Sequence, residues 1–149
     1  MTPTRVLYRS ITQSYYRNSV GVILLYDITQ SSTFRNLQDW LMEVRNFIEA
    51  NSAVFMVIAC KSDLEADRQV MPEQGKAFAD YYSMHFFESS AKTGHNVEEP
   101  FHYITQQIYD RVATGEFRVE EGWEGIKLGF AQPQTQNPIP HGEPVPTCC

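Results

Sequence analysis

An uninterrupted apolar run from Ala53 to Cys60, which ends in charged residues, constrains this chain more than any other feature. A short apolar run with polar flanks is typical of a strand that is buried on both faces. In open α/β sheets, ligands bind just beyond the carboxyl ends of such strands. Lys61 and Asp63 directly follow the run, so the sequence predicts that they lie where a ligand would be held.

Two more strands are predicted on either side of this run. The segment from Val20 to Tyr26 is aliphatic and β-branched, which indicates a second buried strand. The segment from His85 to Glu88 is short and aromatic, and we interpret it as a third strand. A loop of small residues, Ser89 to Gly94, follows it.

Three helices are predicted between and after the strands. Ser31 or Ser32 is expected to cap the first, and Pro72 to begin the second. Asn96 is expected to cap a third that ends at Gly115, with a start at Pro100 itself as the alternative. Apolar residues three and four positions apart should form the buried helix faces: Phe34, Leu37, Trp40, Leu41, Val44, Phe47 and Ile48 in the first, Phe78, Tyr81 and Tyr82 in the second, and Phe101, Ile104, Ile108 and Val112 in the third.

This alternation predicts an α/β fold with a parallel sheet and flanking helices. A chain of 149 residues is long enough for one domain with a sizeable core. The formal net charge of -6 argues against a non-specific nucleic-acid binder, so no nucleic-acid partner is expected. No apolar run reaches the length of a membrane-spanning helix.

An ordered set of motifs follows the predicted strands. The segment YYRNSVGVILLYDIT, the helix that contains Trp40, the segments CKSDL and SSAKTGHNVEE, and the terminal Cys-Cys occur in this order. Together they resemble the C-terminal part of a Rab-type small GTPase of the Ras superfamily. The resemblance implies the C-terminal half of a P-loop small-GTPase domain, a GTP or GDP ligand, and a role in vesicle traffic in the cytosol and on the cytosolic face of intracellular membranes.

The same resemblance implies a role for each residue of a guanine site. Asp63 corresponds to the carboxylate that accepts hydrogen bonds from the guanine edge, and Lys61 to the residue whose stem lies over the base. The loop Ser90-Ala91-Lys92 corresponds to the one whose backbone N–H, at Ala91, meets the guanine carbonyl oxygen. Cys60 stands where the family usually has asparagine, and a thiol is a weaker hydrogen-bonding group, so we expect reduced affinity.

Motifs for holding phosphate and magnesium are absent from the 149 residues. There is no G-x-x-x-x-G-K-[ST] and no Asp-x-x-Gly, and the Gly75-Lys76 pair is interpreted as a surface pair within a helix. We therefore expect an N-terminally truncated Rab-like chain with no catalytic residues and no metal site. The alternative is a non-catalytic interaction product that neither binds nor hydrolyses GTP. The family's first strand would lie beside Val20 to Tyr26, so this strand is expected to form an open apolar edge.

The sequence divides into four predicted regions. Residues 1–8 form a divergent N-terminal segment, 9–115 a partial small-GTPase domain, 116–130 a surface-packed extension, and 131–149 a proline-rich, disordered tail. Cys148 and Cys149 resemble the Rab double-geranylgeranylation signal. The implied partners are the escort and prenylation machinery, trafficking effectors, and a membrane bound through the lipid groups.

Overall fold

The computed structural model describes residue 16 and residues 19–48 and 52–117 of the chain. The elements in chain order are β1 (Gly21–Asp27), α2 (Ser31–Arg35), α3 (Leu37–Arg45), β2 (Val54–Cys60), the 3-10 helix η1 (Glu65–Asp67), α4 (Pro72–Tyr81), β3 (His85–Ser89) and α5 (Glu99–Ala113). The predictions for residues 1–8, the tail and the terminal cysteines lie outside the described residues. Of the predicted extension 116–130, only residues 116 and 117 are described.

The three strands form a parallel sheet in the order β1-β2-β3, which confirms the predicted fold class. The register pairs Asp27 with Cys60, and Cys60 with Ser89. The carboxyl ends of all three strands therefore lie side by side at one edge of the sheet. The segments that follow these strands carry the residues that the sequence assigned to a ligand site.

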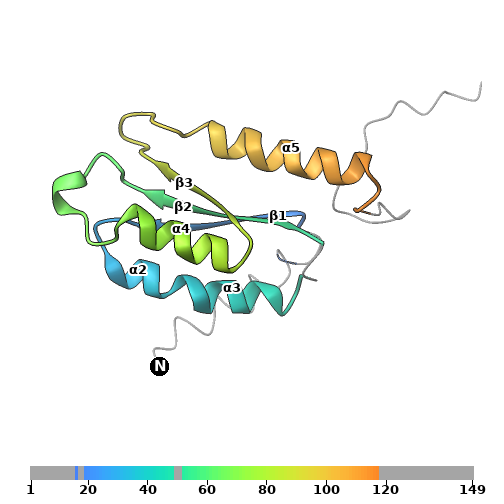
Figure 1. Cartoon of the computed structure of the whole chain (residues 1–149), viewed down its shortest axis with the longest axis horizontal. Coiled ribbons are helices and arrows are strands. Elements are labelled where there is room, and N and C mark those ends of the chain that lie inside the picture. Colours follow the sequence, from blue (N-terminus) through green and yellow to red (C-terminus); the bar gives the residue numbers. More distant parts are fainter. Residues whose placement is uncertain (1–15, 17–18, 49–51, 118–149) are drawn as a thin grey trace, which may run out of the picture.

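Helices cover both faces of the sheet (Figure 1), with α2, α3 and α4 on one side and α5 on the other. Side chains of β2 alternate between these layers, as the period of a strand requires. Phe55 and Val57 join a core with residues of α3 and α4, whereas Met56 and Ile58 join a second core with Ile104 of α5. Burial on both faces explains why this strand reads as a continuous apolar run.

The start of the predicted extension packs against the domain. Phe117 is buried and belongs to the core on the α5 side of the sheet. The guanidinium of Arg111 lies 5.5 Å from the centre of its ring. The end of α5 is turned by Gly115, which has a φ of 77°, and this agrees with its predicted role as a helix terminator.

Two of the predicted helix caps are wrong. The N-cap of α2 is Gln30 rather than a serine, and the hydroxyl of Thr33 donates to the Gln30 carbonyl at 2.7 Å. The N-cap of α5 is Glu98. Asn96 instead has a φ of 48°, and its side-chain amide donates to the Glu88 carbonyl at 3.2 Å, because it serves the preceding loop.

Four aromatic residues that were predicted to be buried are exposed. Trp40 is 43%, Phe47 39%, Phe101 57% and Tyr81 80% exposed. The inner part of the apolar stripe faces the sheet, as with Leu37, Leu41 and Val44 of α3. A wide stripe extends beyond the contact that a flat sheet makes with a helix, so its margins remain in solvent.

The interpretation of Gly75-Lys76 as a surface pair is wrong for the glycine. Gly75 is buried in α4, whereas Lys76 is exposed and pairs with Asp80. A Cβ at position 75 would collide with the Tyr26 hydroxyl and lie 2.6 Å from Cε2 of Phe86. The close approach of α4 to the sheet therefore requires glycine here.

Candidate functional site

The turn after β2 places Lys61 and Asp63 beside the end of β3. Lys61 has a φ of 66°, in the left-handed region that a lysine seldom adopts. Two backbone bonds hold the turn: Leu64 N–H donates to the Lys61 carbonyl at 2.9 Å, and Ser62 N–H donates to the Ser89 carbonyl at 3.1 Å. The chain after β2 is thus tied directly to the chain after β3.

A side-chain bond joins the two segments that the sequence assigned to base recognition. The hydroxyl of Ser90 donates to Oδ1 of Asp63 at 2.5 Å, and Nζ of Lys92 lies 3.9 Å from Oδ2. The side chain of Asp63 is 13% exposed, whereas that of Lys92 is 78% exposed. A carboxylate has about four lone-pair sites, so Asp63 keeps the capacity to accept further hydrogen bonds.

Ser90 also organises the loop that it begins. It is completely buried, and its hydroxyl accepts a bond from Thr93 N–H at 3.2 Å. Its carbonyl accepts from Gly94 N–H at 2.9 Å, and its own N–H donates to the His95 carbonyl at 3.0 Å. These bonds close the loop on itself and leave Ala91 and Lys92 at its outer side, where both are exposed.

Lys61 makes an ion pair that the sequence analysis missed. Its Nζ lies 2.6 Å from Oδ2 of Asp27, at the end of β1, and Thr29 donates to Oδ1 through both its N–H and its hydroxyl. Burial raises the pKa of Asp27, but the bonds from Lys61 and Thr29 outweigh it and hold the pKa below its ordinary value. The same bond to Asp27 raises the pKa of Lys61.

These segments line a cavity of about 520 Å³ at the edge of the sheet. Its walls carry the carboxylate of Asp63, two lysines and the apolar surface of a few neighbours: Cys60, Lys61, Asp63, Leu64, Ser89, Ala91 and Lys92. Among the described residues, nothing accepts a hydrogen bond from Ala91 N–H. The cavity therefore offers an anionic acceptor and a backbone donor, which are the groups that a purine edge needs.

Cys60 is half-buried at the base of this cavity, between Asp27 and Ser89 in the strand register. Its thiol contacts the Ile58 carbonyl at a sulfur–oxygen distance of 4.0 Å. Burial, followed by the negative charge of Asp27, raises the pKa of this thiol. Cys60 is therefore a neutral, weakly hydrogen-bonding group at neutral pH.

A simple signal would have found Asp27 from the sequence. It follows an apolar strand just as Lys61 does, and the ends of parallel strands meet at one edge of the sheet. Within the described ranges, no group of three or more His, Cys, Asp or Glu side chains is placed to hold a metal ion. The helices described here include none that is long and apolar enough to cross a membrane.

Comparison with known proteins gives a consistent result. The sequence model of the Ras family matches residues 5–110. The chain is 45% identical over 131 residues to Ras-related protein rab-39 of Caenorhabditis elegans, a match that covers 86% of this chain and 57% of the relative. It is 42% identical over 123 residues to Ras-related protein Rab-39A of Homo sapiens and of Mus musculus, which covers 83% of this chain and 57% of each relative. The chain thus spans little more than half the length of these curated relatives.

Proposed function

The chain belongs to the Ras family, and from this premise we propose that it is a Rab-type guanine-nucleotide-binding protein of membrane traffic. GTP or GDP is the ligand, and the cavity at the carboxyl ends of the strands holds the guanine base. The proposal is supported by the hydrogen bond from the Ser90 hydroxyl to Oδ1 of Asp63, at 2.5 Å. This bond joins the two loops, so Asp63 and Ala91 line the same cavity. Guanine presents adjacent N–H donors and a carbonyl acceptor along one edge, and these groups complement Asp63 and Ala91.

Lys61 and Lys92 have supporting roles in this proposal. The stem of Lys61 lies over the base, and the stem is accessible to a ligand because the side chain is 52% exposed. Lys92 neutralises part of the charge of Asp63 without competing for its acceptor sites, because their 3.9 Å separation is longer than a hydrogen bond.

The purified 149-residue chain should be titrated with fluorescent GDP in the presence of magnesium. Sub-micromolar binding supports the proposal. Absence of binding would support the alternative function, a non-catalytic Rab-like interaction protein. The same titration without added magnesium shows whether the ion contributes to binding by these residues.

Substitution Asp63→Asn tests base recognition directly. We expect GDP affinity to fall about tenfold to a hundredfold, since a hydrogen bond to a charged group contributes roughly 1.5–3 kcal/mol. Xanthosine diphosphate should bind the variant better than it binds the parent, because its base has a carbonyl where guanine has an amino group and the asparagine amide can donate to it. Glu73→Gln, a change on an exposed carboxylate outside the cavity, is the matched control. Equal losses for both diphosphates would contradict the assignment of Asp63.

We further propose that Cys148 and Cys149 accept geranylgeranyl groups and anchor the protein to cytosolic faces of vesicle membranes. The support is the Cys-Cys terminus together with the similarity to Rab-39 proteins. Two chains anchor a protein stably, whereas one anchors it marginally. Incubation with a Rab prenylation system should add the mass of two geranylgeranyl groups, and a Cys148→Ser and Cys149→Ser double variant should gain none.

A further inference from the structure

A buried arginine lies behind the cavity without touching it. The side chain of Arg68 is 4% exposed, although it is charged. Arginine is rarely buried unless it is paired, because removal of its charge from water costs several kcal/mol. Arg68 is not among the residues that line the cavity. Its partners therefore show what the buried charge holds in place.

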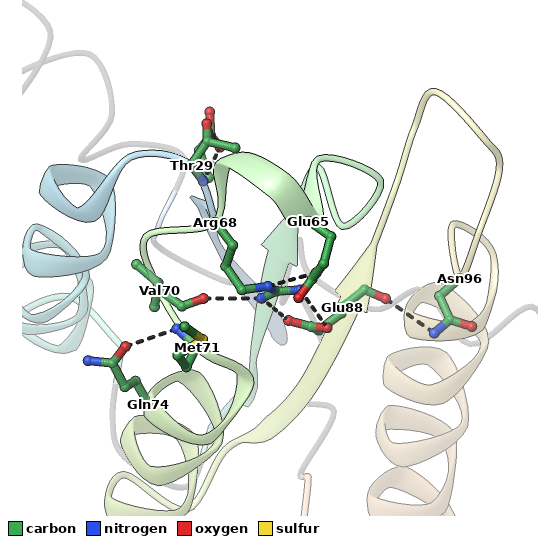
Figure 2. Close-up of polar contacts among 9 residues, drawn as sticks. Thr29, Glu65, Arg68, Val70, Met71, Gln74, Glu88 and Asn96 are labelled. Atoms are coloured by element: carbon green, nitrogen blue, oxygen red, sulfur yellow. Dashed lines mark hydrogen bonds and ion pairs between the residues drawn. The ribbon is translucent and has the colours of Figure 1, made fainter.

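The guanidinium of Arg68 bridges two segments of the chain (Figure 2). On one side, Nε donates to Oε2 of Glu65 in η1 at 2.8 Å. On the other side, the two terminal nitrogens donate to the two carboxylate oxygens of Glu88 in β3, at 2.8 and 3.3 Å. A planar guanidinium suits this two-pronged contact, which the point charge of a lysine does not reproduce.

The segment around Arg68 is also fixed to the end of β1. Arg68 donates to the Val70 carbonyl at 3.1 Å. The N–H groups of Gln69 and Val70 both donate to the Ile28 carbonyl, at 2.8 and 3.1 Å, and the Gln69 side chain accepts from Ser31 N–H. The loop that begins with Lys61 and Asp63 is thereby anchored beside the turn that follows Asp27.

Glu88 connects this anchor to the base-recognition loop. It lies in β3, directly before Ser89 and Ser90. Its side chain is held by Arg68, and its carbonyl accepts from the amide of Asn96 at the far end of the loop (Figure 2). Displacement of Glu88 would therefore move both ends of the Ser90-Ala91-Lys92 loop.

We propose that Arg68 is a positioning residue, which holds the Lys61–Asp63 loop and the Ser90–Lys92 loop in a fixed relation through Glu88. The expected effect of Arg68 on nucleotide binding rests on the proposed function. The coupling of the two loops by Arg68 rests only on the contacts described above. Arg68 acts through Asp63 and Ser90 and touches no ligand. Its removal loosens both loops together.

Amide hydrogen exchange of the whole chain without nucleotide tests the coupling. In Arg68→Lys, we expect the Ser62 and Thr93 amides, which report on the two loops, to exchange at least about tenfold faster, while the amides of β2 and α5 change little. Glu73→Gln, on an exposed carboxylate of α4 outside the network, should have a much smaller effect. If Arg68→Lys does not fold, Glu88→Gln replaces it with the same expectation.

A purely structural role would give a different pattern. Ile104→Val removes a methylene group from the core on the α5 side of the sheet. It therefore serves as a variant that lowers stability without changing the contacts of Arg68. An exchange increase in Arg68→Lys that is uniform across the chain, as expected for Ile104→Val, overturns the proposal. Unchanged exchange at Ser62 and Thr93 overturns it as well.

Competition between GDP and inosine diphosphate tests the consequence for base recognition. Hypoxanthine lacks the 2-amino group, so the preference for GDP reports on the placement of Asp63. Arg68→Lys should reduce this preference by about threefold or more, and Glu73→Gln, on an exposed carboxylate of α4 outside the network, should preserve it. If the parent chain binds neither nucleotide, the proposed function fails, and the exchange measurement still decides the role of Arg68. A preference that is unchanged in Arg68→Lys contradicts the positioning of Asp63.

Discussion

At the scale of single residues, the candidate site is built from ion pairs and hydrogen bonds that span long stretches of sequence. Asp63 is held by Ser90, 27 residues away, and Lys61 by Asp27. Each charged side chain of the cavity thus has a protein partner before any ligand arrives. A guanine base has to share Asp63 with Ser90. Changes at these partners should therefore alter affinity as much as changes at residues that touch the base.

Cys60→Asn should raise GDP affinity. The amide offers stronger donors and an acceptor where the thiol is a weak hydrogen-bonding group, and one net hydrogen bond contributes about 0.5–1.5 kcal/mol, or about twofold to tenfold in affinity. Titration of both proteins with labelled GDP measures the difference. Cys60→Ala is the control, and it should stay close to the parent. If asparagine binds GDP no better than alanine does, position 60 makes no bond to the ligand.

The contribution of the Asp27–Lys61 pair to stability should vanish in acid. The pKa of Asp27 is lower in the folded protein than its ordinary value of 3.8, so the pair stabilises the fold above that value and is lost as the pH falls through the folded pKa. Urea unfolding of the parent and Asp27→Asn should differ at neutral pH and converge as the pH falls through the folded pKa of Asp27. A difference that persists at the lowest pH would show that the carboxylate charge is not its source.

At the scale of elements, the interior of each helix and strand was easier to predict than its ends. Pro72 begins α4 as predicted, and the Gln74 side chain accepts from Met71 N–H at 2.9 Å to complete that helix start (Figure 2). By contrast, Ser31 and Asn96 are not caps, because neighbouring groups compete for the same bonds. Periodicity is repeated over many residues, whereas a cap depends on one side chain and its local alternatives.

Gly75→Ala should destabilise the protein although alanine favours helices. The added methyl group collides with the Tyr26 hydroxyl and with Phe86. This hydroxyl has no hydrogen-bond partner among the described residues, and burial raises the pKa of Tyr26 to about 12. Overpacking lowers the free energy of unfolding by about 1–3 kcal/mol, whereas the better helix propensity of alanine raises it by about 1 kcal/mol at most. Urea denaturation measures the net loss, and Lys76→Ala should change stability by less than about 0.5 kcal/mol. An equal or higher stability for Gly75→Ala would mean that α4 shifts freely from the sheet.

At the scale of the whole molecule, the surroundings of β1 matter most. Within the part of the chain that the structure describes, β1 pairs with β2 alone. That this strand forms an open apolar edge stays a prediction from the sequence. Leu25 is 60% exposed on this strand, and Met42 of α3 is 49% exposed. An unpaired edge with apolar side chains is a template for association with another chain.

The isolated chain should bind a hydrophobic dye strongly and melt over a broad temperature range. Leu25→Lys should lower dye fluorescence and self-association, because a charge on an edge strand opposes pairing with another edge. Leu24→Lys, at a buried neighbour, should instead unfold the protein. Fluorescence, light scattering and calorimetry measure these effects. A sharp, cooperative melt of a monomer that binds no dye would contradict the prediction.

The sequence by itself determined the fold class, the order of the strands and helices, and the identity of most cavity residues. It did so because burial periods and strand-end motifs are local, and a parallel sheet brings strand ends together wherever they occur. Only the tertiary structure decided the partners, such as Ser90 for Asp63, Asp27 for Lys61 and Glu88 for Arg68. Those pairs depend on the register between strands and the course of each loop, and no local pattern encodes the distance between two side chains that lie 20 or more residues apart.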